Sequence, residues 1–451
     1  MQQTVRKFQD ELPLIGHAGQ LAVDPLGFLE RQRTAEPLVA LRLVGRKCFL
    51  VNNAEAAMEV LVSQQERFDK GGPFMEAARQ LVGNGVITCN AEDHRVQRPV
   101  MKPAFHRSRV AGYADVMREC VVEATSSWRA GQVFDVGAAM YRLAALVVAQ
   151  TLVSAPAGKQ AAEAMARALP QLLRGLLRRM LLPAEWIHRV PTPANRRFDQ
   201  ARARLDKAIG EVIAQYRHQE EDDGQDLLSQ IIAGDQGSGR RPDDAEVHDQ
   251  VMSVLAAGVE TTASLLSWTF QLLARHPEIE HRLWEELDGA LSDRPVTFDD
   301  LPSLPYTKRL LTEVLRLYPP AWLLSRIVVE PTEVCGHLLP QGADVLISPY
   351  ALQRNPEVFP DPGRLEPDRW LPERLTPGQR QSFLAFGAGR RRCMGEFFGM
   401  TEATLALATI ARTWQLRPAE PRPVRPLPRF LLVPAERHLL LHQRTPQEGQ
   451  R

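Results

Sequence analysis

Three consecutive arginines stand directly before a cysteine in the stretch FGAGRRRCMG, residues 386–395. A cysteine that precedes a helix lies near the positive end of the helix dipole, and Arg391 adds a positive charge two residues before Cys393. Both effects favour the thiolate, which is the form that acts as a nucleophile or binds a metal. The glycines of the stretch allow a tight bend and close contact with a flat ligand: Gly387, Gly389 and Gly395.

The residues of this loop leave two interpretations open. The Cys393 sulfur can ligate the iron of a porphyrin while Arg391 pairs with a carboxylate at the porphyrin rim. Alternatively, the loop is a basic surface segment that holds an ordinary buried cysteine.

A second unusual segment is AAGVETT, residues 256–262, in the middle of a long helical pattern. Glycine, an acid and two threonines are unfavourable there. A threonine hydroxyl can donate to the carbonyl four residues earlier and open the helix locally. The segment is either a groove for dioxygen or a packing glycine beside a solvated glutamate.

The elements that must position these residues are mostly helices. Apolar residues recur every three or four positions between about 111 and 274, and residues 171–182 form the most amphipathic piece, a predicted core-facing helix. Alternating patterns predict hairpins over residues 38–53 and 326–350. A long helix is expected to begin at the acidic residues 243–244 and to stop at the His-Pro pair 276–277, before a shorter helix over 306–318. Residues 1–451 are therefore predicted to form one helix-rich domain with a minor β component.

Composition narrows the class of protein. The 451 residues carry a net charge of +1, so no global field points to nucleic acid or to a membrane surface. Five widely spaced cysteines show no metal-binding or disulfide pattern, which fits a reducing cytosol. The N-terminus has no apolar leader, and the apolar run at 143–149 is too short to span a bilayer. We expect a cytoplasmic monomer without a membrane span.

The cysteine loop matches the Phe-x-x-Gly-x-Arg-x-Cys-x-Gly signature of the cytochrome P-450 family at every position, and the chain resembles that family over nearly its whole length. The resemblance implies a mainly α fold with small β sheets, in which haem b lies between the long central helix and the cysteine-ligand loop. Cys393 is then the axial thiolate ligand, Arg391 binds a haem propionate and Phe386 covers the proximal face. Gly387 and Gly395 let the loop lie on the ring, and backbone N–H groups after Cys393 hydrogen-bond the sulfur.

The segment 256–262 resembles the family's Ala/Gly-Gly-x-Asp/Glu-Thr motif through Ala257, Gly258, Glu260 and Thr261. The resemblance implies that Ala257 and Gly258 border the haem. Thr261 and Glu260 are then the catalytic residues, which deliver protons to reduced dioxygen with ordered water.

Further motifs follow in the order that the family shows. Glu313 and Arg316 share one helix face, and the resemblance adds Arg369 of PDRW to make a structural charge cluster behind the haem. A surface salt bridge is the alternative for the first pair.

The propionate ligands implied by the resemblance also include His94 and Arg98, although Pro99 is expected to distort their helix. Arg326 is the further candidate for a propionate. The apolar residues before it either belong to the core of a strand or contact the substrate: Trp322, Leu323 and Leu324.

The activity implied is a monooxygenation, in which one oxygen atom of O2 enters a hydrophobic small molecule in secondary metabolism. The chain has no dinucleotide-binding Gly-x-Gly-x-x-Gly unit and no fused reductase domain, so a separate donor is expected, a ferredoxin with an NAD(P)H-dependent ferredoxin reductase. Arg390, Arg392 and Lys102 are candidates for the docking face.

The candidate pocket segments 71–89, 161–217 and 320–327 are largely apolar, which favours a hydrophobic substrate. Resemblance to bacterial terpenoid-oxidising members makes a cyclic terpene the first choice and a macrolide, polyketide or fatty acid the next. The alternatives are a haem-thiolate isomerase, dehydratase or peroxygenase that does not activate O2, and a non-catalytic haem-binding protein. The Glu260–Thr261 pair argues against both.

Overall fold

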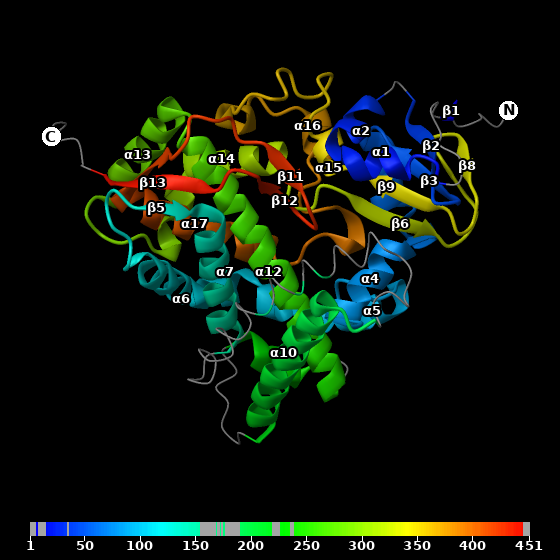
Figure 1. The fold of residues 1–451 in the computed structure, drawn as a ribbon, viewed down its shortest axis with the longest axis horizontal. Coiled ribbons are helices and arrows are strands. Elements are labelled where there is room, and N and C mark those ends of the chain that lie inside the picture. The colour runs from blue at the N-terminus through cyan, green and yellow to red at the C-terminus, as the bar shows by residue number, and fades with distance from the viewer. Residues whose placement is uncertain are drawn as a thin grey trace.

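The long helix α12 (Asp244–Leu273) crosses the middle of the molecule in the computed structural model of the protein (Figure 1). The structure describes residues 6–7, 15–33, 36–153, 168, 172, 175, 190–218, 226–234 and 239–444. A capping box between Asp243 and Glu246 starts α12, and acidic residues in its first turn suit the helix dipole. By length and composition α12 could span a membrane, but 72% of its most apolar window is buried inside the protein, as in a core helix.

Helices make up most of the described chain. Before α12 come α1 (Ala18–Val23), α2 (Pro25–Arg31), α3 (Ala54–Met58), η1 (Glu59–Ser63), η2 (Gln65–Arg67), α4 (Gly72–Val82), α5 (Ala91–Met101), η3 (Lys102–Phe105), α6 (Arg107–Thr125), α7 (Val136–Leu152), α10 (Pro193–His218) and α11 (Leu227–Ala233). After it come α13 (Pro277–Leu291), η4 (Phe298–Ser303), α14 (Pro305–Leu317), α15 (Pro349–Leu352), η5 (Pro367–Trp370), α16 (Pro377–Ser382), η6 (Gly389–Arg391) and α17 (Glu396–Thr413).

A six-stranded sheet forms the second layer, in the order β1-β2-β3-β9-β6-β4. Its strands are β1 (Arg6–Lys7), β2 (Leu38–Leu43), β3 (Arg46–Val51), β4 (Phe68–Asp69), β6 (Leu324–Val328) and β9 (Asp344–Ile347). Strands β3 and β9 run parallel, with Cys48 beside Asp344. Strand β4 pairs with β6 antiparallel, with Phe68 opposite Val328 and Asp69 opposite Ile327. The sheet therefore joins the N-terminal strands to strands about 300 residues later.

Three smaller sheets complete the described fold. Strand β5 (Val133–Asp135) joins β10 (Trp414–Pro418) and β13 (His438–Gln443), while β7 (Thr332–Val334) pairs with β8 (His337–Leu339) and β11 (Pro426–Pro428) with β12 (Leu432–Pro434). The Leu432 carbonyl accepts hydrogen bonds from Ser264 Oγ (2.7 Å) and Trp268 Nε1 (3.0 Å) of α12. This hairpin thereby anchors the central helix.

The predicted elements are largely confirmed. Strands β2 and β3 form the expected hairpin, and α12 ends just before the His-Pro pair. The expected β region after residue 326 contains β6, the β7–β8 hairpin and β9. The mainly α fold class with small sheets is confirmed. Most of the predicted helix at 171–182 lies outside the described residues, as does the pocket segment between 161 and 189 apart from residues 168, 172 and 175.

Candidate active site

The cysteine loop is closed by a hydrogen bond from the Cys393 amide to the Phe386 carbonyl, at 2.8 Å. Gly387 and Gly389 both have φ of +67°, a region that side chains strain to enter. A Cβ on Gly389 would lie 1.8 Å from the Leu61 carbonyl oxygen, so only glycine fits there. Cys393 is exposed, whereas Cys48, Cys89 and Cys120 are buried. The loop therefore presents one sulfur of the chain at a surface.

The protonation of Cys393 differs from the sequence expectation. The sulfur faces open space but is surrounded by many protein atoms, and the resulting loss of solvation is the dominant effect that raises the pKa of the thiol, aided by the nearby Glu396 carboxylate. A hydrogen bond from the Gly395 amide lowers that pKa, as do the charges of Arg98 and Arg392, but they do not outweigh burial. The local charges and the helix start therefore act in the predicted direction, towards the thiolate, but desolvation outweighs them. A coordinated metal ion itself deprotonates a thiol, so the ligand assignment does not depend on it.

Basic side chains from four parts of the chain gather near this loop, around one carboxylate. His94 and Arg98 come from α5, Arg326 from β6 and Arg391 from η6, and the charges of all three arginines act on His94. Lys70 belongs to the same group, which we call the cationic cluster, and sequence reasoning missed it.

Asp69 is the carboxylate within this group. Arg391 Nη2 donates to Asp69 Oδ1 and to the Cys89 carbonyl, each at 3.0 Å. Asp69 also accepts backbone N–H bonds from Lys70 and Ala91.

The charges of the cationic cluster fit a ligand with two carboxylates. Arg391 and Arg326 share the single aspartate, so one positive charge has no counter-charge even before Arg98 and Lys70 are included. Arg326 is buried, and burial beside Arg391 lowers its pKa to about 10. His94 is also buried, and burial together with the nearby arginines lowers its pKa to about 3, which keeps it neutral. The propionates of a porphyrin would supply the missing negative charge.

The arrangement of Arg98 resolves the question raised by Pro99. Helix α5 continues past Pro99 to Met101, so the predicted distortion does not end the helix. Arg98 Nη2 donates to the Arg392 carbonyl at 2.9 Å. Arg98 therefore reaches the cysteine loop itself.

The middle of α12 has the hydrogen bond expected from its sequence. Thr261 Oγ1 donates to the Ala257 carbonyl at 2.6 Å, while α12 stays helical throughout. Ala257 is exposed, although its neighbour Ala256 is buried. A Cβ on Gly258 would lie 2.9 Å from Val148, so the glycine allows α7 to pack closely against α12.

Glu260 lies on the same segment. Burial raises the pKa of its carboxyl to about 7, against the opposing charges of Arg437 and Arg429. The group can therefore gain and lose a proton near neutral pH, which suits a proton relay.

A second acid near this segment was missed by sequence reasoning. Glu402 of α17 is 1% exposed, and its Oε2 accepts a hydrogen bond from Thr262 Oγ1 at 3.2 Å. Its Oε1 has no partner among the described residues. Burial raises the pKa of Glu402 well above its usual value, so the side chain is a neutral acid. A glutamate in a helix ordinarily indicates a solvated face, and nothing in the sequence marked this one.

The charge cluster predicted behind the haem is assembled in the structure. Arg316 Nη2 and Nε donate to Glu313 at 2.7 and 2.9 Å, and Arg369 Nε lies 3.4 Å from the same carboxylate. Glu313 and Arg316 are fully buried. Trp370 Nε1 also donates to Glu313 at 2.8 Å, a partner that sequence reasoning missed. The cluster ties α14 to η5, which supports a structural role.

The three apolar residues proposed for the substrate pocket pack against core clusters. Trp322 Nε1 donates to the Arg429 carbonyl at 3.0 Å, and the side chain packs against the cluster of Leu26, Tyr350 and Leu432. Leu323 and Leu324 are partly buried against the two faces of the large sheet. All three side chains therefore pack against the core, and their contact with substrate stays a prediction.

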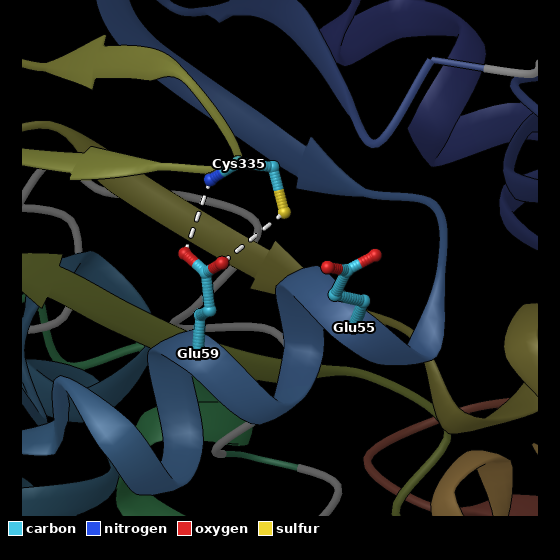
Figure 2. A group of neighbouring side chains, drawn as sticks. All are labelled: Glu55, Glu59 and Cys335. Atoms are coloured by element: carbon cyan, nitrogen blue, oxygen red, sulfur yellow. Dashed lines mark hydrogen bonds between the residues drawn. The ribbon is translucent and has the colours of Figure 1, made fainter.

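Another group of possible metal ligands lies elsewhere. Figure 2 shows Glu55 and Glu59 from the α3–η1 segment beside Cys335 in the turn between β7 and β8. Glu59 accepts the Cys335 N–H at 3.0 Å, and its other oxygen lies 3.6 Å from the sulfur. Burial and the two carboxylates raise the pKa of Cys335 to about 12. Glu59 thus anchors the β7–β8 turn.

A presented thiol beside a site for two carboxylates is the arrangement of a haem-thiolate protein. A sequence model described as cytochrome P450 matches residues 7–442, and the chain belongs to that family. It is therefore a cytochrome P450 monooxygenase with a cysteine-ligated haem.

Relatives and solved structures agree with this assignment. The chain is 45% identical to cyclooctatin synthase of Streptomyces melanosporofaciens, over 94% of this chain and 92% of that protein. It is 41% identical to pentalenene oxygenase of Streptomyces avermitilis, over 96% of each chain. It is also 41% identical to cyclooctat-9-en-7-ol 5-monooxygenase of Streptomyces melanosporofaciens, over 90% of this chain and 88% of that one. The crystal structure of a mutant cytochrome P450DA heme domain superposes with a TM-score of 0.88 at 26% identity, covering 98% of both chains.

Proposed function

We propose that this monooxygenase oxidises a cyclic terpene and uses haem b held by Cys393. The observation that supports the cofactor assignment is the cationic cluster, whose excess positive charge suits the two propionates of iron protoporphyrin IX. The substrate class is supported by the names of two relatives, an oxygenase of pentalenene and a monooxygenase of cyclooctat-9-en-7-ol. A macrolide, polyketide or fatty acid is the next substrate class.

Residues of the chain have distinct tasks in this proposal. When bound, the haem supplies activation of O2, with electron donation from the thiolate. Gly387 and Gly389 hold the Cys393 sulfur at the loop surface, while Arg391, Arg326 and Arg98 bind the carboxylates.

On the other side of the site, the Thr261 hydroxyl is held at the Ala257 carbonyl, where it can orient a water. Glu260 takes protons from solvent near pH 7 and passes them on through that water.

A separate ferredoxin, reduced by an NAD(P)H-dependent ferredoxin reductase, is the proposed donor. A surface cavity of 690 Å³ is lined by basic residues that include Arg95, Arg98, Lys102 and Arg390. Arg390 pairs with Glu66, and Arg392 pairs with Glu396 at 2.8 Å, so Lys102 is the strongest remaining candidate for attracting an acidic partner. Lys102→Glu should slow reduction by ferredoxin at low salt without changing reduction by dithionite. Residues 1–451 are proposed to act as one cytoplasmic, monomeric domain.

Three measurements test the proposal. The reduced protein with carbon monoxide should give the red-shifted Soret band of a thiolate ligand, and Cys393→Ala should abolish it.

A spin-state titration should show tighter binding of cyclic terpene hydrocarbons and alcohols than of macrolides or fatty acids; the opposite order would overturn the substrate class. Product that forms with peroxide alone, and not with O2 and ferredoxin, would favour a peroxygenase, and unchanged coupling in Thr261→Ala would remove the relay role.

A further inference from the structure

The loop between β12 and β13 contacts both α7 and α12. The Val136 amide at the start of α7 donates to the Arg437 carbonyl at 2.8 Å, and a Cβ on Gly137 would lie 3.3 Å from the Arg437 side chain. Gln271 of α12 donates to the Glu436 carbonyl of the same loop at 3.0 Å. The two helices and the loop therefore border one region of the molecule.

Tyr141 lies on the face of α7 that meets this loop. It follows Gly137 by four residues, so the two share one face of the helix. Burial raises the pKa of the Tyr141 hydroxyl, and the negative charge of Glu260 raises it further, which means that the two side chains lie near each other. The phenol therefore stays protonated and can act as a hydrogen-bond donor at neutral pH.

Glu260 reaches the same region from α12. Ser264 lies four residues after it on the same helix face, and the Ser264 hydroxyl donates to the Leu432 carbonyl of β12 at 2.7 Å. The charges that act on the Glu260 carboxyl come from Arg437 and Arg429, at the two ends of β12. Neither arginine donates a hydrogen bond to it, and no other described residue does. The carboxyl therefore has acceptor sites for a water.

The Tyr141 hydroxyl is buried and has no hydrogen-bond partner among the residues that the structure describes. Burying a hydroxyl without a hydrogen bond is unfavourable, and in native proteins a bound water commonly supplies the missing bond. Such a water needs at least two polar partners. Tyr141 provides one of them and Glu260 provides another.

We propose that the Tyr141 hydroxyl and the Glu260 carboxylate hold one water between them, and that Tyr141 is thereby a positioning residue for the proton supply of Glu260. The hydroxyl donates to the water oxygen, and the water donates to the carboxylate. When Glu260 has given its proton towards Thr261, this water passes a proton to the carboxylate and regains one from solvent. The inference rests on the proposed relay role of Glu260 and adds a residue that no motif of the chain marks.

The test follows the carboxyl of Glu260 in the holoenzyme by infrared difference spectroscopy across neutral pH. The carboxylic acid band that titrates in the wild type and is missing from Glu260→Gln belongs to this group, and its midpoint should lie near the pKa of about 7. Tyr141→Phe removes the donor that fixes the water and so destabilises the carboxylate. The midpoint should therefore rise by about 0.4–1 pH unit, the effect of one lost hydrogen bond.

Tyr113→Phe is the matched control. Tyr113 of α6 also has a buried hydroxyl without a partner among the described residues, but the charged groups that act on it are Arg109 and Asp226. This variant should leave the midpoint of Glu260 unchanged. An unchanged midpoint in Tyr141→Phe, or an equal rise in both variants, would overturn the proposal.

A second measurement is the fraction of electrons that end in product at saturating substrate. This fraction should fall by about 3- to 10-fold in Tyr141→Phe and stay constant in Tyr113→Phe, while both variants keep the thiolate carbon monoxide band of the wild type. A fraction in Tyr141→Phe equal to that of the wild type would contradict the positioning role. A wild type without a titrating band of Glu260 would instead refute the relay acid of the proposed function.

Discussion

Glu260→Gln tests the protonation of the proposed relay acid through the pH dependence of stability. The carboxyl of Glu260 has a pKa of about 7 in the folded protein, against 4.5 for an ordinary glutamate. A raised folded pKa stabilises the protein below the unfolded value, and that contribution is lost as pH rises from about 4.5 to 7. Glutamine does not titrate, so the wild type should lose stability relative to the variant over this range.

The size of the effect follows from the shift. About 2.5 pH units at about 1.4 kcal/mol each give roughly 3–4 kcal/mol, and the partial exposure of Glu260 reduces this to about 1–3 kcal/mol. At about 2.1 cal/mol/K per residue, a chain of 451 residues shifts its Tm by on the order of 1 °C per kcal/mol.

The assay is thermal unfolding of both proteins at pH 5 and pH 8, followed by circular dichroism. The Tm of Glu260→Gln minus that of the wild type should increase by about 1–3 °C between the two pH values. The coupling of electrons to product should also have a midpoint near pH 7 in the wild type and lose it in the variant. A Tm difference that is the same at both pH values would refute the assigned pKa and with it the relay acid.

Three further substitutions probe other contacts of the structure. Glu313→Gln leaves the buried Arg316 without its counter-charge and should lower the free energy of unfolding by about 3–5 kcal/mol. The measured effects are a lower Tm and faster haem loss. The control is Glu333→Gln, which changes an exposed glutamate and should leave stability unchanged. Gly389→Ala places a Cβ against the Leu61 carbonyl and should distort the cysteine loop, so the thiolate carbon monoxide band should be lost at a lower temperature than in the wild type. An equally stable band would contradict the loop geometry. Glu402→Gln keeps a neutral group on Thr262 and should change stability by less than about 1 kcal/mol at pH 6; a cost of 3 kcal/mol or more would show that the acid is ionised.

Local spacing explains which parts of the site could be predicted from the sequence. The loop around Cys393 and the Glu313–Arg316 pair depend on residues a few positions apart, so their geometry is encoded within one turn or one helix. The Thr261 hydrogen bond is likewise a property of four successive residues.

Contacts between distant segments account for what was missed. Lys70 joins Arg326 only because β4 pairs with β6, and Glu402 is neutral only because α17 buries it against α12. The raised pKa of Cys393 has the same origin, since burial is a property of the folded loop and not of the arginines beside it in the sequence. The Trp370 donor to Glu313 also requires η5 to dock on α14.

The pairing of β3 with β9 has a consequence for how the protein is made. A ribosome adds about 5–20 residues per second, so β3 waits roughly 15–60 s for its neighbour almost 300 positions later. During that time the edge of β3 that β9 will cover offers unpaired N–H and C=O groups to other chains. Cys393 is synthesised later still, so haem can bind only after the period in which the edge of β3 is unpaired and open to aggregation. We therefore expect the yield of soluble protein in a cell to depend on chaperones more than on the supply of haem.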